Sequence, residues 1–261
     1  MNALDRILAR VRERLPAQIA AHSFDDVQRA AEAAPPRPSF REAVERAGTS
    51  VIAEVKHASP SRGVLRDPFD PVELATAYRD GGARAISVLT EPDFFGGSPD
   101  HLRAVRDRVD LPILRKDFLL DPYQIYEARA WGASAILLIV AAVETSRLED
   151  LLFAARSVGL DALVEVHTPG EAEEALRAGA RLVGINNRDL TTFRTDRATT
   201  ATVASVIGGD ATIVSESGIF TRADVLEVEA AGASAVLVGE ALVTSADPRA
   251  KVAELTGEEP A

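Results

Sequence analysis

Gly132-Ala133-Ser134-Ala135-Ile136 is one of four copies of a short pattern in which a glycine is followed at once by an apolar stretch. The other copies begin at Gly82, Gly179 and Gly232, so that successive copies are 50, 47 and 53 residues apart. A glycine in this position commonly ends a helix, and the apolar residues after it are typical of a buried strand. The pattern indicates a regular alternation of helices and strands, with two strand–helix units in each period.

Eight apolar segments fit this alternation as strands, at residues 51–56, 84–89, 112–115, 134–140, 161–166, 181–186, 211–215 and 234–238. Amphipathic segments between them are predicted as helices, at 71–80, 122–131, 144–157, 169–178 and 221–231. Eight parallel strands with right-handed crossovers could close as a barrel or stay open as a doubly wound sheet. The repeat lacks a Gly-x-Gly-x-x-Gly turn after the first strand, which favours an α/β protein with a (β/α)8 TIM barrel.

Residues 1–48 precede the repeat and are predicted to form an N-terminal helical extension. An apolar stripe at helical spacing consists of Leu4, Ile7, Leu8, Val11 and Leu15. The proline-rich segment 33–38 interrupts the helical pattern. Ser39 with Glu42 then indicates a capping box that opens a short helix, which Gly48 would close. We expect a single domain over residues 1–261, with the barrel at 49–256.

Composition restricts the classes of partner and location. The formal net charge of -11 and the pI of about 4.9 argue against a nucleic-acid or anionic-membrane surface. Cysteine is absent, which excludes disulfides, thiolate nucleophiles and cysteine metal sites. The N-terminus lacks the apolar core of a signal peptide and no apolar run reaches membrane-spanning length, so we expect a cytoplasmic location. His22, His57, His101 and His167 show no spacing typical of metal ligation, so we expect no metal.

The lysines stand out because only Lys56, Lys116 and Lys251 occur among 29 basic residues. Two of them end predicted strands. Arginine keeps its proton near neutral pH, whereas the pKa of a lysine in a cleft can be shifted until the amine donates its proton. Glu54 lies two residues before Lys56, on the same face of its strand, where the two groups would shift each other's pKa. The pattern indicates proton-transfer chemistry at the strand ends.

Polar residues gather where the predicted strands end, which is the active-site face of a (β/α)8 barrel. The residues at these ends are Glu54, Lys56, Lys116, Glu165, Asn186, Arg188, Glu216, Ser217, Gly218, Gly239 and Glu240. The glycines after the last two strands, together with Ser59 and Arg188, fit a phosphate group, because free backbone N–H groups near a helix start bind anions. Phe94, Phe95 and Phe118 fit an apolar wall for a flat ligand and fit loop packing equally well. We expect His167 to be exposed.

Five segments together resemble one family. They are Ile-Ala-Glu-Val-Lys-x-Ala-Ser-Pro-Ser at 52–61, Leu-Arg-Lys-Asp-Phe at 114–118, Val-Glu-Val-His at 164–167, Gly-Ile-Asn-x-Arg-Asp-Leu at 184–190 and Glu-Ser-Gly at 216–218. Over nearly the whole chain, these segments resemble indole-3-glycerol phosphate synthase. The resemblance implies a (β/α)8 barrel of the tryptophan pathway. It would convert 1-(2-carboxyphenylamino)-1-deoxyribulose 5-phosphate to indole-3-glycerol phosphate with loss of CO2 and water, using no cofactor or metal.

The resemblance also implies roles for individual residues. Lys116 resembles the general acid and Glu165 the general base of the dehydration. Lys56 would hold the anthranilate carboxylate and share proton donation, with Glu54 orienting it. The remaining substrate contacts would come from Asn186 and Glu216 for the ribulose hydroxyls, from Phe118, and from Ser59, Arg188, Ser217, Gly218, Gly239 and the Glu240 backbone N–H for the phosphate. The division of acid and base roles stays open, as does the choice between Asn186 and Asn187.

Three alternatives remain. A phosphoribosylanthranilate isomerase would need an acid–base pair that includes a cysteine, which this chain lacks. A Schiff-base aldolase would use Lys116 or Lys56 covalently. A non-catalytic phosphosugar-binding barrel would keep Gly218 and Gly239 but would not need the lysines and glutamates. As partners we expect a small phosphorylated substrate, with no nucleic acid and no membrane. We expect a monomer, and its weak association with other enzymes of the pathway stays open.

Overall fold

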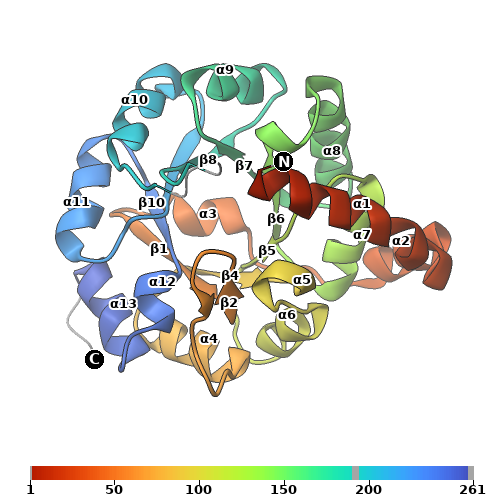
Figure 1. Ribbon diagram of the computed structural model, residues 1–261, viewed down its shortest axis with the longest axis horizontal. Coiled ribbons are helices and arrows are strands. Elements are labelled where there is room, and N and C mark those ends of the chain that lie inside the picture. The colour runs from red at the N-terminus through yellow and green to blue at the C-terminus, as the bar shows by residue number, and fades with distance from the viewer. Residues whose placement is uncertain (1, 190–193, 258–261) are drawn as a thin grey trace.

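Eight parallel strands close into a barrel in the computed structural model, which describes residues 2–189 and 194–257 (Figure 1). The strands, in the order in which they pair around the barrel, are β1 (Ser50–Val55), β10 (Ala235–Val238), β9 (Thr212–Glu216), β8 (Leu182–Asn186), β7 (Asp161–Val166), β6 (Ala135–Ile139), β5 (Ile113–Lys116) and β4 (Ala85–Leu89). Each predicted strand is present, with both ends within one residue of the prediction. The (β/α)8 barrel is confirmed, and the open doubly wound sheet is wrong.

Helices surround this barrel (Figure 1). They are α4 (Pro71–Asp80), α6 (Pro99–Arg106), α7 (Pro122–Trp131), α8 (Thr145–Ser157), α9 (Pro169–Arg177), α10 (Ala198–Ile207), α11 (Arg222–Ala230) and α13 (Pro248–Thr256). Several begin with a proline directly after a capping side chain: Asp70, Asp121 and Asp247 each accept a hydrogen bond from a backbone N–H of the first turn. The five helices predicted from the sequence agree with the structure within one residue at each end.

Short elements that were not predicted follow several of the strands. They are the hairpin of β2 (Ala58–Ser59) and β3 (Gly63–Val64), α5 (Pro92–Phe95), the 3-10 turn η1 (Val140–Ala142) and α12 (Glu240–Val243). None is longer than four residues, so none carries a hydrophobic period that sequence analysis could detect. They belong to the loops at the carboxyl ends of the strands, where they shape the rim.

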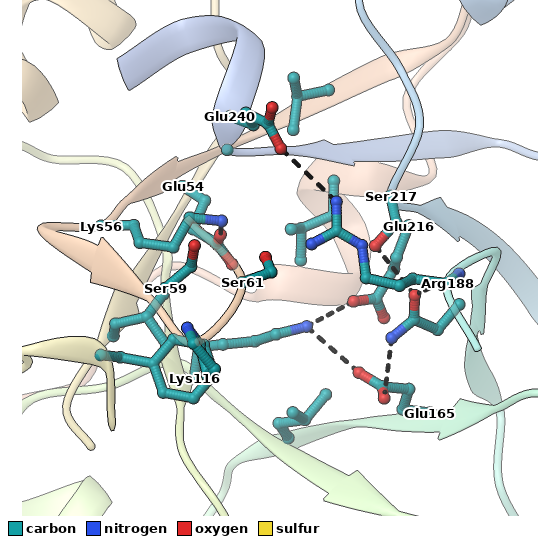
Figure 2. Close-up of a pocket in the computed structure, with 18 of the residues that line it drawn as sticks. Glu54, Lys56, Ser59, Ser61, Lys116, Glu165, Arg188, Glu216, Ser217 and Glu240 are labelled. Atoms are coloured by element: carbon teal, nitrogen blue, oxygen red, sulfur yellow. Dashed lines mark hydrogen bonds and ion pairs between the residues drawn. The ribbon is translucent and has the colours of Figure 1, made fainter. Parts of the chain in front are cut away.

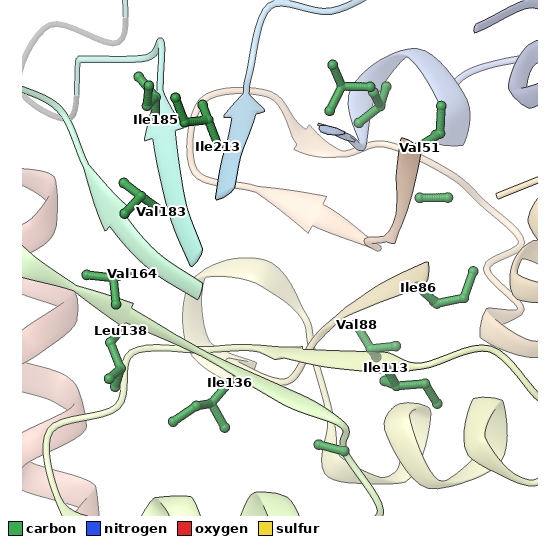
Figure 3. Close-up of a cluster of buried hydrophobic side chains, with 14 of the residues drawn as sticks. Val51, Ile86, Val88, Ile113, Ile136, Leu138, Val164, Val183, Ile185 and Ile213 are labelled. Carbon is green, nitrogen blue, oxygen red and sulfur yellow. The ribbon is translucent and has the colours of Figure 1, made fainter. Parts of the chain in front are cut away.

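Strand residues alternate between two apolar layers. One layer packs the outer face of the strands against the helices and includes Val51, Ile86, Ile113 and Val164 (Figure 3). The other fills the barrel interior and includes Ile52, Leu114, Leu163 and Val214 together with residues of the N-terminal extension. Val51 and Ile52 are neighbours that enter different layers, as the two-residue period of a strand requires.

The N-terminal extension forms α1 (Ala3–Ala21), α2 (Phe24–Ala33) and α3 (Phe40–Val44), and it meets the barrel at both ends. At the amino-terminal end of β1, the Ser50 hydroxyl donates to the Val44 carbonyl, and fully buried Phe40 joins the interior layer, so α3 plugs that end. Leu4 and Ile7 of α1 lie over the opposite end. Figure 1 shows α3 within the ring of strands and α1 crossing beside it.

The predicted capping box before α3 is only half confirmed. The Ser39 hydroxyl accepts from the Glu42 backbone N–H, but this helix start is not a complete capping box. The helix also ends at Val44, with Glu45 as its cap, and not at Gly48. The chain has to reach β1 at Ser50, so the last residues before it form the connecting turn.

A buried charged cluster fixes the end of β5 against α7. The Arg115 guanidinium is 3.0 Å from Asp117 and 3.4 Å from Glu127, and it lies 4.1 Å from the ring centre of Trp131. Thr90 donates its hydroxyl hydrogen to the same Asp117 carboxylate. Burial raises the pKa of Glu127, although the Arg115 charge works in the opposite direction. Two carboxylates therefore depend on a single buried guanidinium.

We expect Arg115→Met to lower the free energy of unfolding by about 3 kcal/mol, because it leaves buried carboxylates without their cation. Urea denaturation of the purified variant measures the change. Arg103→Met is the matched control, because Arg103 also lies over Trp131 but is half exposed and pairs with the exposed Asp100, so it should cost less than about 1 kcal/mol. Equal losses of unfolding free energy in the two variants would show that the buried ion pairs of Arg115 contribute no more than the exposed pair of Arg103.

Candidate active site

A pocket opens at the carboxyl ends of the barrel strands, beneath α1. Every residue to which the family resemblance gave a role lines it. Its lining includes Glu54, Lys56, Ser59, Lys116, Phe118, Glu165, Asn186, Arg188, Glu216, Ser217, Gly218, Gly239 and Glu240. These residues come from all parts of the chain and meet only because the barrel closes. Figure 2 shows many of them facing a common space.

Lys116 is the centre of the pocket's charge network. Its amine forms ion pairs with Glu216 and, at 3.3 Å, with Glu165, which come from β9 and β7 (Figure 2). Burial alone would lower the pKa of the Lys116 amine, but the charges of Glu216, Glu165 and Glu54 outweigh it and raise that pKa. In the free pocket the Lys116 amine therefore keeps its proton at neutral pH, because three carboxylates surround it.

The two carboxylates that share Lys116 titrate differently. Burial would raise the pKa of Glu165, but Lys116, His167 and Asn186 outweigh it and lower that pKa. Burial also acts on Glu216, and there it prevails over Lys116, with repulsion from Glu165, and raises the pKa to about 7. Glu216 Oε1 is buried and has no hydrogen-bond partner within the described residues. Of these two carboxylates, Glu165 therefore stays ionised at neutral pH, whereas Glu216 titrates near pH 7.

Glu54 and Lys56 form the second ion pair, with 2.6 Å between the Lys56 amine and Glu54 Oε1. The prediction that they share a strand face is confirmed. Gly239 makes room for this pair, because a Cβ at Gly239 would lie 2.8 Å from the Lys56 amine and would contact Glu54 Oε1 even more closely. Gly184 has the same relation to Glu216 Oε1. Gly239 was predicted from the sequence as a phosphate ligand, and this need for space was not predicted.

Asn186 faces the pocket and Asn187 does not. The Asn186 amide donates to Glu165 Oε1 at 3.1 Å, and its carbonyl oxygen accepts from the Ser217 hydroxyl at 2.9 Å. Asn187 is buried behind the strand, where its amide donates to the Ser215 hydroxyl. The ambiguity left by the sequence is thereby answered in favour of Asn186.

The loops after β9 and β10 form one wall of the pocket. Ser217 and Gly218 both have positive φ, 68° and 79°, a conformation that is costly for serine and is therefore usually maintained by its surroundings. The Glu240 carboxylate forms ion pairs with two arginines, Arg62 at 2.8 Å and Arg188 at 3.5 Å. From the sequence, Glu240 was predicted to contribute only its backbone N–H, and Arg62 was not predicted, because one loop arginine among many carries no signal.

The apolar side of the pocket combines loop aromatics with the N-terminal helix. Phe95 and Phe118 line it, with ring centres 6.1 Å apart, whereas Phe94 lies outside the lining. Leu4 and Ile7 of α1 cover the same space. The extension is therefore part of the site.

His167 contradicts the expectation of an exposed side chain. Only 14% of it is exposed, and its ring lies between Glu165 and Glu171. The charges of these carboxylates raise its pKa, although burial alone would lower it. Because Glu171 belongs to α9, no pattern within β7 could have indicated this contact.

Residues 4–255 match the family model of indole-3-glycerol phosphate synthase. The chain belongs to the indole-3-glycerol phosphate synthase family. An indole-3-glycerol phosphate synthase from Mycolicibacterium smegmatis is 53% identical over 254 residues, covering 97% of this chain and 93% of the relative. Those from Mycolicibacterium vanbaalenii and Mycobacterium tuberculosis (strain ATCC 25618 / H37Rv) are 54% and 52% identical with the same coverage. The resemblance seen in the motifs is thus confirmed.

Solved structures outside the indole-3-glycerol phosphate synthase family share the fold. A 3-hexulose-6-phosphate synthase superposes with a TM-score of 0.67 at 17% identity, covering 80% of this chain and 99% of that protein. The enzyme of that name from Salmonella typhimurium gives 0.67 at 15% identity, covering 80% of this chain and 97% of its own. At such identities the likeness concerns the barrel alone.

Two features are absent from the described residues. No helix there combines the length and apolar character that a membrane crossing needs. No three of the His, Asp and Glu side chains in the same residues come together in a way that could hold a metal ion.

We expect the free energy of unfolding of Glu216→Gln to increase relative to that of the unaltered chain as the pH rises. The pKa of Glu216 rises from an ordinary 4.5 to about 7 on folding, so between these values the folded chain binds the extra proton and loses stability with increasing pH. Glutamine does not titrate, so the difference should grow by about 2 to 3 kcal/mol between pH 4 and pH 8.

Urea denaturation at several pH values measures this difference, with exposed Glu149→Gln as the control whose difference should stay constant. A Glu216→Gln difference that is also independent of pH would contradict the raised pKa.

Proposed function

We propose that this pocket converts 1-(2-carboxyphenylamino)-1-deoxyribulose 5-phosphate to indole-3-glycerol phosphate, CO2 and water. The observation that carries the proposal is the Lys116 amine shared by Glu165 and Glu216 in a pocket of this family's barrel. Ring closure needs a proton for the ribulose carbonyl oxygen when the aryl carbon attacks the carbonyl carbon. Decarboxylation then restores the aromatic ring, and loss of a hydroxyl and a proton completes the indole.

Lys116 is the proposed acid of ring closure. Its amine is fully charged in the free pocket, so it both carries the proton and stabilises negative charge that develops on the carbonyl oxygen. Substrate hydroxyls that engage Glu216 would weaken its hold on Lys116 and make the proton easier to transfer. The unpartnered Glu216 Oε1 supports this, because it is a buried acceptor without a donor in the described residues.

Glu165 is the proposed base of the dehydration. Its lowered pKa keeps it a carboxylate at neutral pH, so it can accept a proton. Asn186 hydrogen-bonds to it at 3.1 Å and lies where a ribulose hydroxyl would bind. Lys56 would pair with the substrate carboxylate while Glu54 orients the amine from 2.6 Å.

The two ends of the substrate would bind at opposite walls. The phosphate would bind at the loops that hold Ser59, Arg188, Ser217, Gly218, Gly239 and the Glu240 backbone N–H, which is the usual phosphate position in this fold. The anthranilate ring would pack on Phe118 and Phe95 beneath α1. The proposed steps use no redox cofactor and no metal. The monomeric state, the cytoplasmic location and association with other enzymes stay predictions from the sequence.

The direct test adds the carboxyphenylamino-deoxyribulose phosphate to the purified chain in the presence of a chelator. We expect the appearance of indole fluorescence and the release of one CO2 for each product formed. A chain that is folded by circular dichroism but forms no product would refute the proposed function.

Lys116→Arg should lower kcat by about a hundredfold or more, because guanidinium keeps the charge but does not release its proton near neutral pH. Lys251→Arg is the control, because Lys251 pairs with Glu254 on α13 and does not line the pocket, so its rate should be unchanged. Steady-state kinetics by indole fluorescence compare the two variants. A near-normal kcat in Lys116→Arg would remove Lys116 from the acid role.

A further inference from the structure

His167 reaches the proposed base from behind the pocket. Its Nε2 is 3.6 Å from Glu165 Oε1, while its Nδ1 is 3.4 Å from Glu171 Oε2. The same Glu171 oxygen accepts the His167 backbone N–H at 2.7 Å. The ring thus lies between two carboxylates, one from β7 and the other from the first turn of α9.

The Nε2 atom is buried without a hydrogen-bond partner among the described residues. A buried N–H group usually has an acceptor, and a carboxylate oxygen of Glu165 lies 3.6 Å from this atom. A small movement of either side chain would close the remaining gap. The orphaned N–H is therefore poised to bond to Glu165.

His167 differs from the other donors around Glu165 in its position. Lys116 and Asn186 contact the Glu165 carboxylate from inside the pocket, where both line the space that a substrate would fill. His167 is not part of that lining. A substrate that takes over Lys116 and Asn186 would leave His167 as the remaining donor to Glu165.

We propose that His167 is a positioning residue that, in its charged form, keeps Glu165 deprotonated and oriented while substrate engages the other donors. The inference rests on the proposed function, because it gives Glu165 the role of base. The charged groups that face this pair are Glu171 from α9, Lys116 from β5 and Glu216 from β9. The raised pKa of His167, which follows from the charges of Glu165, Glu171 and Glu216, agrees with a charged ring near neutral pH.

The positive charge of His167 determines the direction in which the pKa of Glu165 changes. A cation next to Glu165 lowers its pKa, so removal of that cation raises the pKa and protonates the base at a higher pH. In His167→Gln the acidic limb of the kcat profile should move up by about one pH unit, which is about a tenfold loss of rate on that limb. Above the shifted limb the rate should stay within about twofold of the unaltered chain.

Kinetics over pH 5 to 9 by indole fluorescence test the proposal, with two further variants. His167→Lys keeps a positive charge and should restore the acidic limb. His22→Gln makes the same chemical change at an exposed histidine outside the pocket and should leave the profile unchanged. A His167→Gln profile identical to that of the unaltered chain would overturn the proposal, and so would a uniform loss of rate that His167→Lys does not rescue.

A readout that does not depend on the reaction separates this inference from the proposed function. The chain has only four histidines, so NMR titration of their ring signals can follow His167 alone. Its pKa should fall in Glu165→Gln and in Glu171→Gln. If the unaltered chain forms no indole but this coupling is seen, the function fails and the electrostatic pairing stands. A His167 pKa that neither variant changes would overturn the pairing itself.

Discussion

The Lys116 amine between buried carboxylates is the interaction on which the site depends. A charged amine at this depth is tolerated only because Glu165 and Glu216 pair with it, and the carboxylates tolerate burial only because the amine is there. The three groups lie at or next to the carboxyl ends of β5, β7 and β9, so their meeting requires that these strands reach the same height in the barrel. Pairing of Asn186 with Glu216 in the β8–β9 register helps to set that height.

Neighbouring residues leave room for the charged side chains of the pocket and hold the strand that carries Lys116. Gly184 and Gly239 lack a side chain where Glu216 and the Glu54–Lys56 pair need room. On the other face of β5, Arg115 anchors the strand through Asp117, while its neighbour Lys116 points into the pocket. The strand alternation thus separates a stabilising cluster from a chemical one. The two clusters share a backbone, so the position of Lys116 depends on the packing behind it.

What the sequence predicted and what it missed differ in the range of the interactions involved. The strands and the polar residues at their ends follow from local signals, namely the two-residue period and the glycine that closes each preceding helix. The burial of His167 depends on a carboxylate of α9, and the pairing of Arg62 with Glu240 joins residues far apart in the chain. The raised pKa of Lys116 likewise needs three carboxylates from different strands. No pattern within one segment carries such information.

The distribution of charge within the pocket would determine the orientation in which the proposed substrate binds. Its ion-pair network joins Glu54, Glu165 and Glu216 to only two lysines, and the whole chain is also acidic. An anionic substrate would therefore be repelled unless its charges met separate cations. Arg188 and the glycine-containing loops offer one such place for the phosphate, and Lys56 offers another for the carboxylate. The uncharged ribulose carbons would then lie between them, next to Lys116, which is where the proposed proton transfers occur.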